Sequence, residues 1–356
     1  MLLSMRNASL RYLHARLVRF SGMLVAVLVA AGGAQYAAAQ NVPLISGGVG
    51  FFTDTSGGQT SYQPHIEPLI AAPIGKSLLV EGRGIILEEF SPNGNGGYSH
   101  SHFASLLYLQ GDYMATKHLT VVAGSYLVPF NTYNDRLSEI WIENLQDGPL
   151  TAGIGTLGTG TGVGGMLSGN AASGDKFSIS YNAWFSARSG NMYFNSDRSS
   201  GGRAYLYLPE ARLEIGTSYD RQLQGKQENF EGVHVWWEPK DTGLRMRSEW
   251  SRGAHAQGYW VETDYRTHAF GGPDNWIRRF EPVFRMQQTF RINQLGSDSV
   301  PSVNSQRVDF GLDYNLPHNV RILTSYGRQF SSTDVNIWET GIVYRFLFPT
   351  WKGKAD

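Results

Sequence analysis

Residues 211–221 read Ala-Arg-Leu-Glu-Ile-Gly-Thr-Ser-Tyr-Asp-Arg. Apolar and polar side chains alternate through this stretch, with Leu213 and Ile215 on one side of the alternation and Glu214 and Asp220 on the other. A β-strand points successive side chains to opposite faces, so the stretch predicts a strand with one apolar face and one charged face. The fold class follows from how often this pattern recurs.

The same alternation recurs along most of the chain and predicts an all-β fold. Most segments have about the ten-residue length that a tilted membrane-spanning strand needs. Their number is even, as in single-chain bacterial membrane barrels, and counts of about 14 or 18 are the neighbouring alternatives. The sixteen predicted strands cover residues 45–53, 62–71, 77–90, 99–113, 118–128, 161–169, 176–187, 202–208, 211–221, 230–238, 244–252, 259–267, 277–291, 307–316, 319–329 and 335–348.

The connections between these segments alternate between longer polar stretches and short turns. Residues 54–61 are followed by a short turn at 73–75, and residues 292–303 are followed by Pro317-His318. Membrane barrels have short turns at the periplasmic end and longer loops at the external end. On this count the interval 128–160 is the third external loop.

The charged face of the strands separates a membrane barrel from a soluble one. A soluble barrel or sandwich buries its apolar face, whereas a membrane barrel points that face at lipid and its polar face at the lumen. Sixteen strands would enclose an interior too wide for apolar side chains to fill. The sequence therefore predicts a transmembrane antiparallel β-barrel with an aqueous lumen. The lumen wall is predicted to include Glu81, Arg83, Arg212, Glu214, Arg245, Arg247 and Glu249.

Residues 1–39 are predicted to be a cleaved signal peptide. Residues 1–19 contain four arginines and no acid, residues 20–34 are apolar or small, and Ala37-Ala38-Ala39 fits a cleavage site. An uncleaved anchor helix over residues 20–39 is the alternative, because this run is just long enough to span a bilayer. The predicted organisation is a signal peptide at 1–39, an outer-membrane barrel at 40–348 and a short tail at 349–356.

The composition excludes several classes of protein. Without the signal peptide, 26 of the 30 basic residues remain against 30 acidic ones, which is not the balance of a nucleic-acid binder. The chain has no cysteine, so disulfides, a thiol nucleophile and a lipid-modified cysteine are ruled out. After residue 40, no apolar run approaches the roughly 18 residues of a membrane-spanning helix.

The interval 128–160 departs from the two-residue period. Its apolar residues Leu137, Ile140, Trp141 and Leu145 recur at three-residue to four-residue spacing, which predicts a short amphipathic helix. Acidic residues recur every four positions, so this helix would carry an acidic stripe beside its apolar one. The stripe consists of Asp135, Glu139, Glu143 and Asp147, with Arg136 as the only basic residue of the interval.

Three short motifs carry a resemblance to known proteins. Residues 338–348 look like the aromatic-ended last strand by which bacterial outer-membrane barrels are recognised for insertion, which implies the barrel-assembly machinery as a partner. Gly124 through Pro129-Phe130, and residues 213–219, resemble the phosphate-selective porin O and P family and its uncharacterised relatives. The resemblance implies a sixteen-stranded, trimeric bacterial outer-membrane porin with an infolded third loop.

Two departures from this family bear on the solute. The family's phosphate selectivity comes from arginine and lysine residues along the pore, whereas this chain has only seven lysines after residue 39 and an acidic third loop. Asn131 stands where relatives commonly have glycine after Pro-Phe. Phosphate specificity is therefore not expected here.

The expected function is that of an outer-membrane porin surrounded by lipid, through which small hydrophilic solutes or ions diffuse passively. Asp135, Arg136, Glu139, Glu143 and Asp147 would form the constriction and face wall arginines across the lumen, which creates a transverse field. The alternative is that the stripe is a solvated loop face and that the arginines pair with Glu81, Glu214 and Glu249. An outer-membrane enzyme and a surface binding or adhesion barrel are the competing classes, although no local signature selects a nucleophile.

Two other motifs favour structural explanations. His100 and His102 share a strand face and could ligate a metal, but the sequence around them supplies no third ligand. Gly162-Val163-Gly164-Gly165 lacks the strand-to-helix context of a phosphate-binding loop. Neither a metal nor a cofactor is therefore expected.

Overall fold

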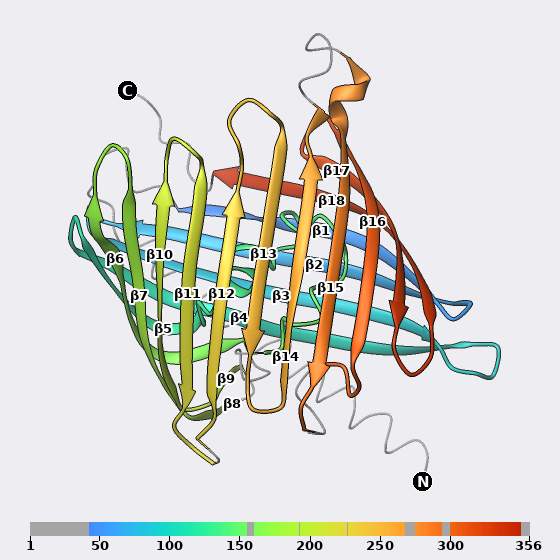
Figure 1. Cartoon of the computed structure of the whole chain (residues 1–356), viewed down its shortest axis with the longest axis horizontal. Helices are drawn as coiled ribbons and strands as arrows, with labels where there is room; N and C mark the ends of the chain where they lie inside the picture. The colour runs from blue at the N-terminus through green and yellow to red at the C-terminus, as the bar shows by residue number, and fades with distance from the viewer. Residues whose placement is uncertain are drawn as a thin grey trace, which may run out of the picture.

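The computed structural model describes residues 43–154, 160–191, 193–225, 227–267, 275–293 and 300–349, and its strands close into a barrel (Figure 1). Each barrel strand pairs antiparallel with its neighbours in sequence, and β1 closes the barrel against β18. The barrel strands are β1 (Leu44–Ser56), β2 (Gln59–Ile74), β3 (Leu78–Pro92), β4 (Tyr98–Thr116), β5 (Leu119–Leu127), β6 (Thr161–Ser173), β7 (Ser178–Ala187), β10 (Ser199–Leu208), β11 (Leu213–Gln222), β12 (Asn229–Trp237), β13 (Leu244–Arg252), β14 (Ala256–Tyr265), β15 (Phe280–Arg291), β16 (Ser305–Leu316), β17 (Val320–Phe330) and β18 (Val335–Pro349).

The prediction of a sixteen-stranded all-β barrel is confirmed, and every predicted segment coincides with one barrel strand. Between β7 and β10, the short strands β8 (Ser189–Asn191) and β9 (Phe194–Ser196) form a separate two-stranded sheet. Within the described residues, no helix is both long enough and apolar enough to cross a membrane. The predicted signal peptide at 1–39 lies outside the described residues, and so do all residues of the predicted tail beyond Pro349.

The two faces of the barrel wall are inverted relative to a soluble protein. In β11, Ser218 and Asp220 are 3% and 1% exposed, whereas the outward-facing Ile215 and Tyr219 are 43% and 44% exposed. Apolar side chains that cover the outside of a closed barrel suit lipid, and inward polar side chains suit an aqueous lumen. The strand alternation therefore has the sense that was predicted for a membrane barrel.

The connections alternate less regularly than the sequence indicates. Gly57-Gly58 alone joins β1 to β2, because β2 begins at Gln59, so the predicted long connection at 54–61 is wrong. At the opposite end of the barrel, residues 266–279 between β14 and β15 form one of the longer connections and include the 3-10 helix η2 (Trp276–Arg279). The antiparallel order still makes 128–160 the third connection at its end of the barrel.

Residues 128–154 fold back inside the barrel, where they follow β5 and are drawn in green (Figure 1). Their only α-helix within the described residues is α2 (Tyr133–Arg136), a single turn. The predicted amphipathic helix is therefore wrong, because α2 ends before Leu137, the first apolar residue of the predicted helix. Residues after Arg136 form turns and bends that place their side chains against different parts of the wall.

Candidate functional site

The infolded segment, residues 128–154, begins where β5 and β6 separate. The Val128 N–H donates to the Gly160 carbonyl at 3.0 Å, which joins the two ends of the connection. From there the segment crosses the lumen and makes hydrogen bonds to strands on opposite sides of the barrel, including β3, β11, β13 and β16. It is therefore attached to the wall around much of the lumen.

Asn131 makes the first of these attachments. Its N–H donates to Ser218 Oγ at 2.9 Å, and its side-chain amide donates to Ser251 Oγ at 2.9 Å. Its φ of 54° lies in the left-handed region, which glycine and asparagine adopt most readily. On the wall beneath it, a Cβ at Gly232 would lie 2.3 Å from Asn131 Oδ1, so only glycine leaves room for the asparagine.

Glu249 of β13 holds the start of α2. Its Oε1 accepts hydrogen bonds from the Thr132 N–H at 2.7 Å, the Thr132 hydroxyl at 2.6 Å and the Tyr133 N–H at 2.7 Å. Its Oε2 accepts from Trp260 Nε1 at 3.2 Å. The carboxylate thus satisfies backbone donors that the first turn of a helix leaves free.

Asp135 and Arg136 each form an ion pair with the wall. Arg203 of β10 donates from both terminal nitrogens to the Asp135 carboxylate, at 3.0 and 2.8 Å. Arg136 pairs with Glu214 of β11, and its guanidinium lies 4.6 Å from the ring centroid of Trp236. Two residues predicted for the constriction are therefore in direct contact with β10 and β11.

Glu139 contacts the opposite side of the lumen through Arg83 of β3. Arg83 Nη1 lies 3.3 Å from Glu139 Oε1, and Arg83 Nη2 lies 2.9 Å from Glu67 Oε2. The same Nη2 donates to the Ser138 carbonyl at 2.9 Å. Arg83 is 1% exposed, so this guanidinium is shared between the segment and the wall in a buried position.

Glu143 accepts a hydrogen bond from the Tyr133 hydroxyl rather than from an arginine. Its backbone carbonyl accepts from the Arg321 guanidinium of β17. Burial raises the pKa of the Glu143 carboxyl to about 8, against the opposing effects of the Tyr133 hydrogen bond and the nearby Arg285 charge. The Glu143 side chain is therefore mostly protonated at neutral pH.

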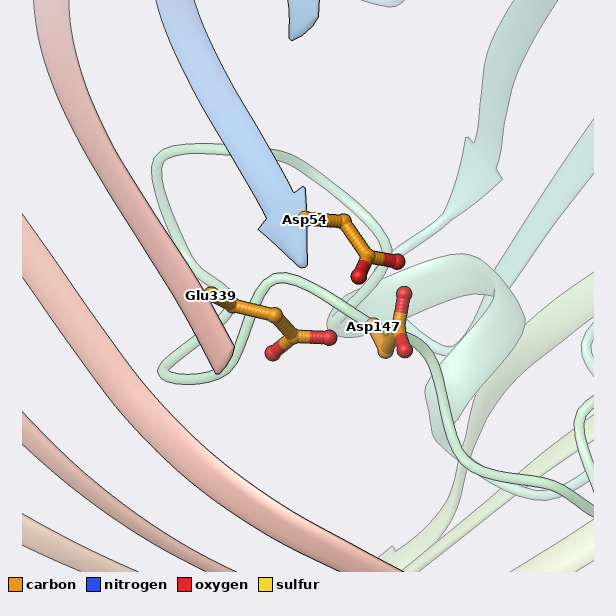
Figure 2. A group of neighbouring side chains, drawn as sticks. All are labelled: Asp54, Asp147 and Glu339. Atoms are coloured by element: carbon orange, nitrogen blue, oxygen red, sulfur yellow. The ribbon is translucent and has the colours of Figure 1, made fainter. Parts of the chain in front are cut away.

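Asp147 lies beside two wall carboxylates. Arg307 of β16 donates to Asp147 Oδ2 at 2.6 Å and to Glu339 Oε1 at 3.2 Å. In Figure 2 the carboxyl groups of Asp147, Asp54 at the end of β1 and Glu339 on β18 converge, and one oxygen of each lies within 4.8 Å of the others. Three acids thus gather where the segment meets the seam of the barrel.

Apolar side chains seat the middle of the segment. Ile140 packs in a buried cluster with Phe52, Leu323 and Val343, which project inward from β1, β17 and β18. Leu145 is 1% exposed, and its Cδ2 would lie 2.7 Å from a Cβ at Gly311. The wall is therefore apolar or lacks a side chain at the points where the apolar residues of the segment press on it.

The remaining wall residues have different roles. Arg245 contacts Asp264 at 2.7 Å and Glu281 at 2.9 Å, so its charge is balanced mainly within the wall. Arg247 likewise pairs with Glu262, and Glu81 accepts from Gln110 at 3.0 Å.

Arg212 is the exception among the predicted wall residues. It lies in the turn between β10 and β11 with a φ of 48° and is exposed, so its placement on the lumen wall is wrong. The period-two pattern extends one residue beyond the strand, because the turn begins before Leu213. The alternation alone does not mark that boundary.

The sequence did not single out Arg203, Arg307 or Arg321 as partners of the segment. All three lie on strands. The sequence signal that could have identified these arginines is their position on the inward-facing side of the alternating strand pattern. The arrangement that results is a set of contact ion pairs, instead of acids and arginines facing each other across an open gap.

A cavity of about 220 Å³ remains between the segment and the wall. It is bounded by the segment and by β1, β2, β3 and β18. Its polar lining includes Asp54, Gln63, His65, Glu67, Glu143, Gln146, Asp147 and Glu339, and its apolar lining includes Phe52, Ile85, Leu87 and Ile140.

His100 and His102 are not part of this site. Both contact Glu88, each ring nitrogen lying 2.5 Å from a different carboxylate oxygen, and both are about half exposed. Between β3 and β4 the register shifts, because Arg83 pairs with Tyr108 whereas the next residue, Gly84, pairs with Leu106. Because the alternation changes sides there, the two histidines lie on the outward face of their strand.

Comparison with known proteins identifies a shared fold. No family model and no curated protein matches the chain. Among solved structures, OmpF of Salmonella typhi in complex with daunomycin is 11% identical, with 86% of this chain and 98% of that chain covered and a TM-score of 0.60. A loop L8 deletion mutant of OmpT, an outer membrane protein of Vibrio cholerae, is 10% identical, with 86% and 100% covered and a TM-score of 0.56. An anion-selective porin from Comamonas acidovorans is 11% identical, with 85% and 98% covered and a TM-score of 0.54. The chain therefore has the barrel fold of outer-membrane porins.

Proposed function

We propose that the protein is a bacterial outer-membrane porin through which small hydrophilic solutes or ions diffuse passively. The observation that carries this proposal is the inverted wall, with apolar side chains outside a closed barrel and charged side chains inside it. A lumen lined by ionised and hydrogen-bonding groups stays hydrated, and a hydrated lumen conducts. The shared fold with outer-membrane porins supports the same conclusion.

In this proposal, the infolded segment sets the size of the passage. Asp135, Arg136, Glu139, Glu143 and Asp147 belong to the constriction, and Arg83, Glu214 and Glu249 are the wall residues that hold it in place. The support is the set of direct contacts between the two groups. A segment fixed at several points narrows the lumen to a constant width, whereas a free loop would not.

Several finer assignments belong to the same proposal. They are a signal peptide at residues 1–39, insertion by the barrel-assembly machinery and a homotrimeric assembly, as the sequence motifs and the family resemblance imply. The short motifs shared with the phosphate-selective porin O and P family support a distant relation to that family. The acidic segment gives no reason to extend phosphate selectivity to this chain.

Planar-bilayer recording of the purified, folded protein tests the proposal. Folding is checked first by heat-modifiability on gels, which reports an intact barrel. A porin that inserts into the bilayer should give discrete stepwise increases in conductance in potassium chloride. A folded barrel that never conducts would refute the porin assignment and would favour an enzyme or a surface binding protein.

A further inference from the structure

The charges around the cavity are unbalanced. Arg83 is shared by Glu67 and Glu139, and Arg307 is shared by Asp147, Asp309 and Glu339. On this side of the lumen Arg321 of β17 pairs with Asp313, and Arg83 and Arg307 between them serve five carboxylates. Asp54 adds a sixth carboxylate, whose Oδ1 is buried without a hydrogen-bond partner in the described part of the chain.

The lining offers little other positive charge. Among the described residues, His65 is the only imidazole in the cavity lining, and its Nε2 already lies 3.2 Å from Glu67 Oε1. No lysine or arginine contributes to the lining within the described residues. Glu143 is left out of this count because its carboxyl group accepts from the Tyr133 hydroxyl instead of pairing with a guanidinium.

The adjoining part of the wall is more nearly compensated. On β13, β14 and β15, three arginines interleave with three acids, and each arginine contacts at least one of the acids. This network consists of Arg245, Arg247, Arg285, Glu262, Asp264 and Glu281. Compared with these three strands, the part of the wall at the seam has the larger excess of carboxylates over guanidinium groups.

We infer that the solutes this lumen favours are small cations, both hydrated monovalent ions and small organic amines, and that they pass along the cavity beside Asp54, Asp147 and Glu339. The inference rests on the proposed porin function and adds its charge selectivity and its route. Carboxylates within 4.8 Å of one another repel, so a cation that passes between them lowers their energy, whereas an anion raises it. The mixed lining also offers Phe52 and Ile140 to the alkyl part of an amine.

Reversal potentials in a potassium chloride gradient test the inference on the full folded barrel. Wild-type channels should pass potassium in preference to chloride. Asp54→Asn should lower the potassium-to-chloride permeability ratio roughly twofold, and Asp54→Lys should lower it further, because one charge near the path acts through water and salt. Asp54 is the best position for this change, because its unpartnered oxygen leaves few contacts to disturb.

Glu231→Gln is the matched control, because it removes one carboxylate from the exposed outer face of β12. Its permeability ratio should equal that of the wild type. Conducting wild-type channels that prefer chloride would overturn the inference, and so would Asp54 variants whose ratio equals that of the control. Both results differ from a barrel that does not conduct, which would instead refute the porin function itself.

Discussion

Replacement of Glu249 by glutamine should release the infolded segment from β13 without disturbing the barrel. Glu249 Oε1 accepts three hydrogen bonds from Thr132 and Tyr133, all between 2.6 and 2.7 Å. Glutamine keeps the shape of the side chain but removes its charge. It also turns an NH2 group toward the Trp260 N–H, which currently donates to Glu249 Oε2 at 3.2 Å.

The size of the effect follows from the loss of the charged acceptor. Hydrogen bonds to a charged group contribute about 1.5–3 kcal/mol, and those between neutral groups contribute about 0.5–1.5 kcal/mol. Three bonds would each lose about 1 kcal/mol, but they share one oxygen, so a total of about 2–3 kcal/mol is expected. Every 1.4 kcal/mol is a factor of ten, so the released population should rise about 30-fold to 150-fold.

Tryptic cleavage after Arg136 measures this population. Arg136 is the only basic residue between positions 128 and 160, and while the segment is seated it is held by Glu214 and Trp236. Proteolysis under native conditions follows the open population when opening and closing are fast relative to cleavage. Mass spectrometry would identify the fragment that ends at Arg136 and give its rate of formation.

The control and the contradicting result are both well defined. Glu231→Gln should leave the rate of cleavage at Arg136 unchanged, and heat-modifiability should show intact barrels for both variants. If the Glu249→Gln rate lies within about threefold of the wild-type rate, the carboxylate contributes less than 1 kcal/mol and the account of this anchor is wrong.

Three further predictions concern the same segment. The pKa of Glu143 is raised from 4.5 to about 8 when the segment is seated, so the seated state binds more protons and should become less stable as the pH rises from about 4.5 to 8. The ratio of the Glu143→Gln cleavage rate to the wild-type cleavage rate should therefore fall over that range. A ratio that does not change with pH would contradict this prediction. Gly232→Ala should raise the cleavage rate by one to two orders of magnitude, because its Cβ would lie 2.3 Å from Asn131 Oδ1 and overpacking costs about 1–3 kcal/mol; a wild-type rate would show that Asn131 adjusts freely. Ile140→Ala should weaken seating by about 2–5 kcal/mol and make single-channel conductance larger or noisier, and quiet wild-type traces would argue against the apolar anchor.

The sequence predicted the strands well because each strand separates two solvents. In β11, for example, Ile215 faces lipid and Ser218 faces the lumen, so the two-residue period is preserved along the strand. Strand ends were less predictable, since a turn residue such as Arg212 continues the alternation without belonging to the strand. The first connection was predicted to be too long, because two glycines with positive φ, Gly57 and Gly58, are enough to make the turn between β1 and β2.

The infolded segment was harder to predict, because inside the barrel the spacing of apolar residues no longer indicates which face of a helix is buried. A helix on a surface buries one face, so apolar spacing reports that face. Inside a barrel the wall surrounds the segment, and Ile140 and Leu145 are buried against different strands. The apolar spacing of residues 137–145 therefore matched that of a helix, although the only helix of the segment within the described residues is the single turn α2.

Among the charges, Arg83 was named among the wall arginines that face the acidic stripe, and it contacts Glu139. Arg203 and Arg307 were not, because which inward arginine meets which acid depends on the register of the closed barrel.

The position of Ile140 bears on whether the barrel closes before or after the segment is seated. Its apolar pocket is built by Phe52 from the first strand and by Leu323 and Val343 from the last two, and the pocket does not exist until β1 pairs with β18. Its neighbour Asp147 reaches Arg307 over 160 positions of sequence. Such distant contacts form late, because the entropy of closing the intervening chain must be lost first. Because this pocket requires β1 to be paired with β18, we expect the barrel to close before the segment is fully seated, so the lumen should be wider at closure than in the folded protein.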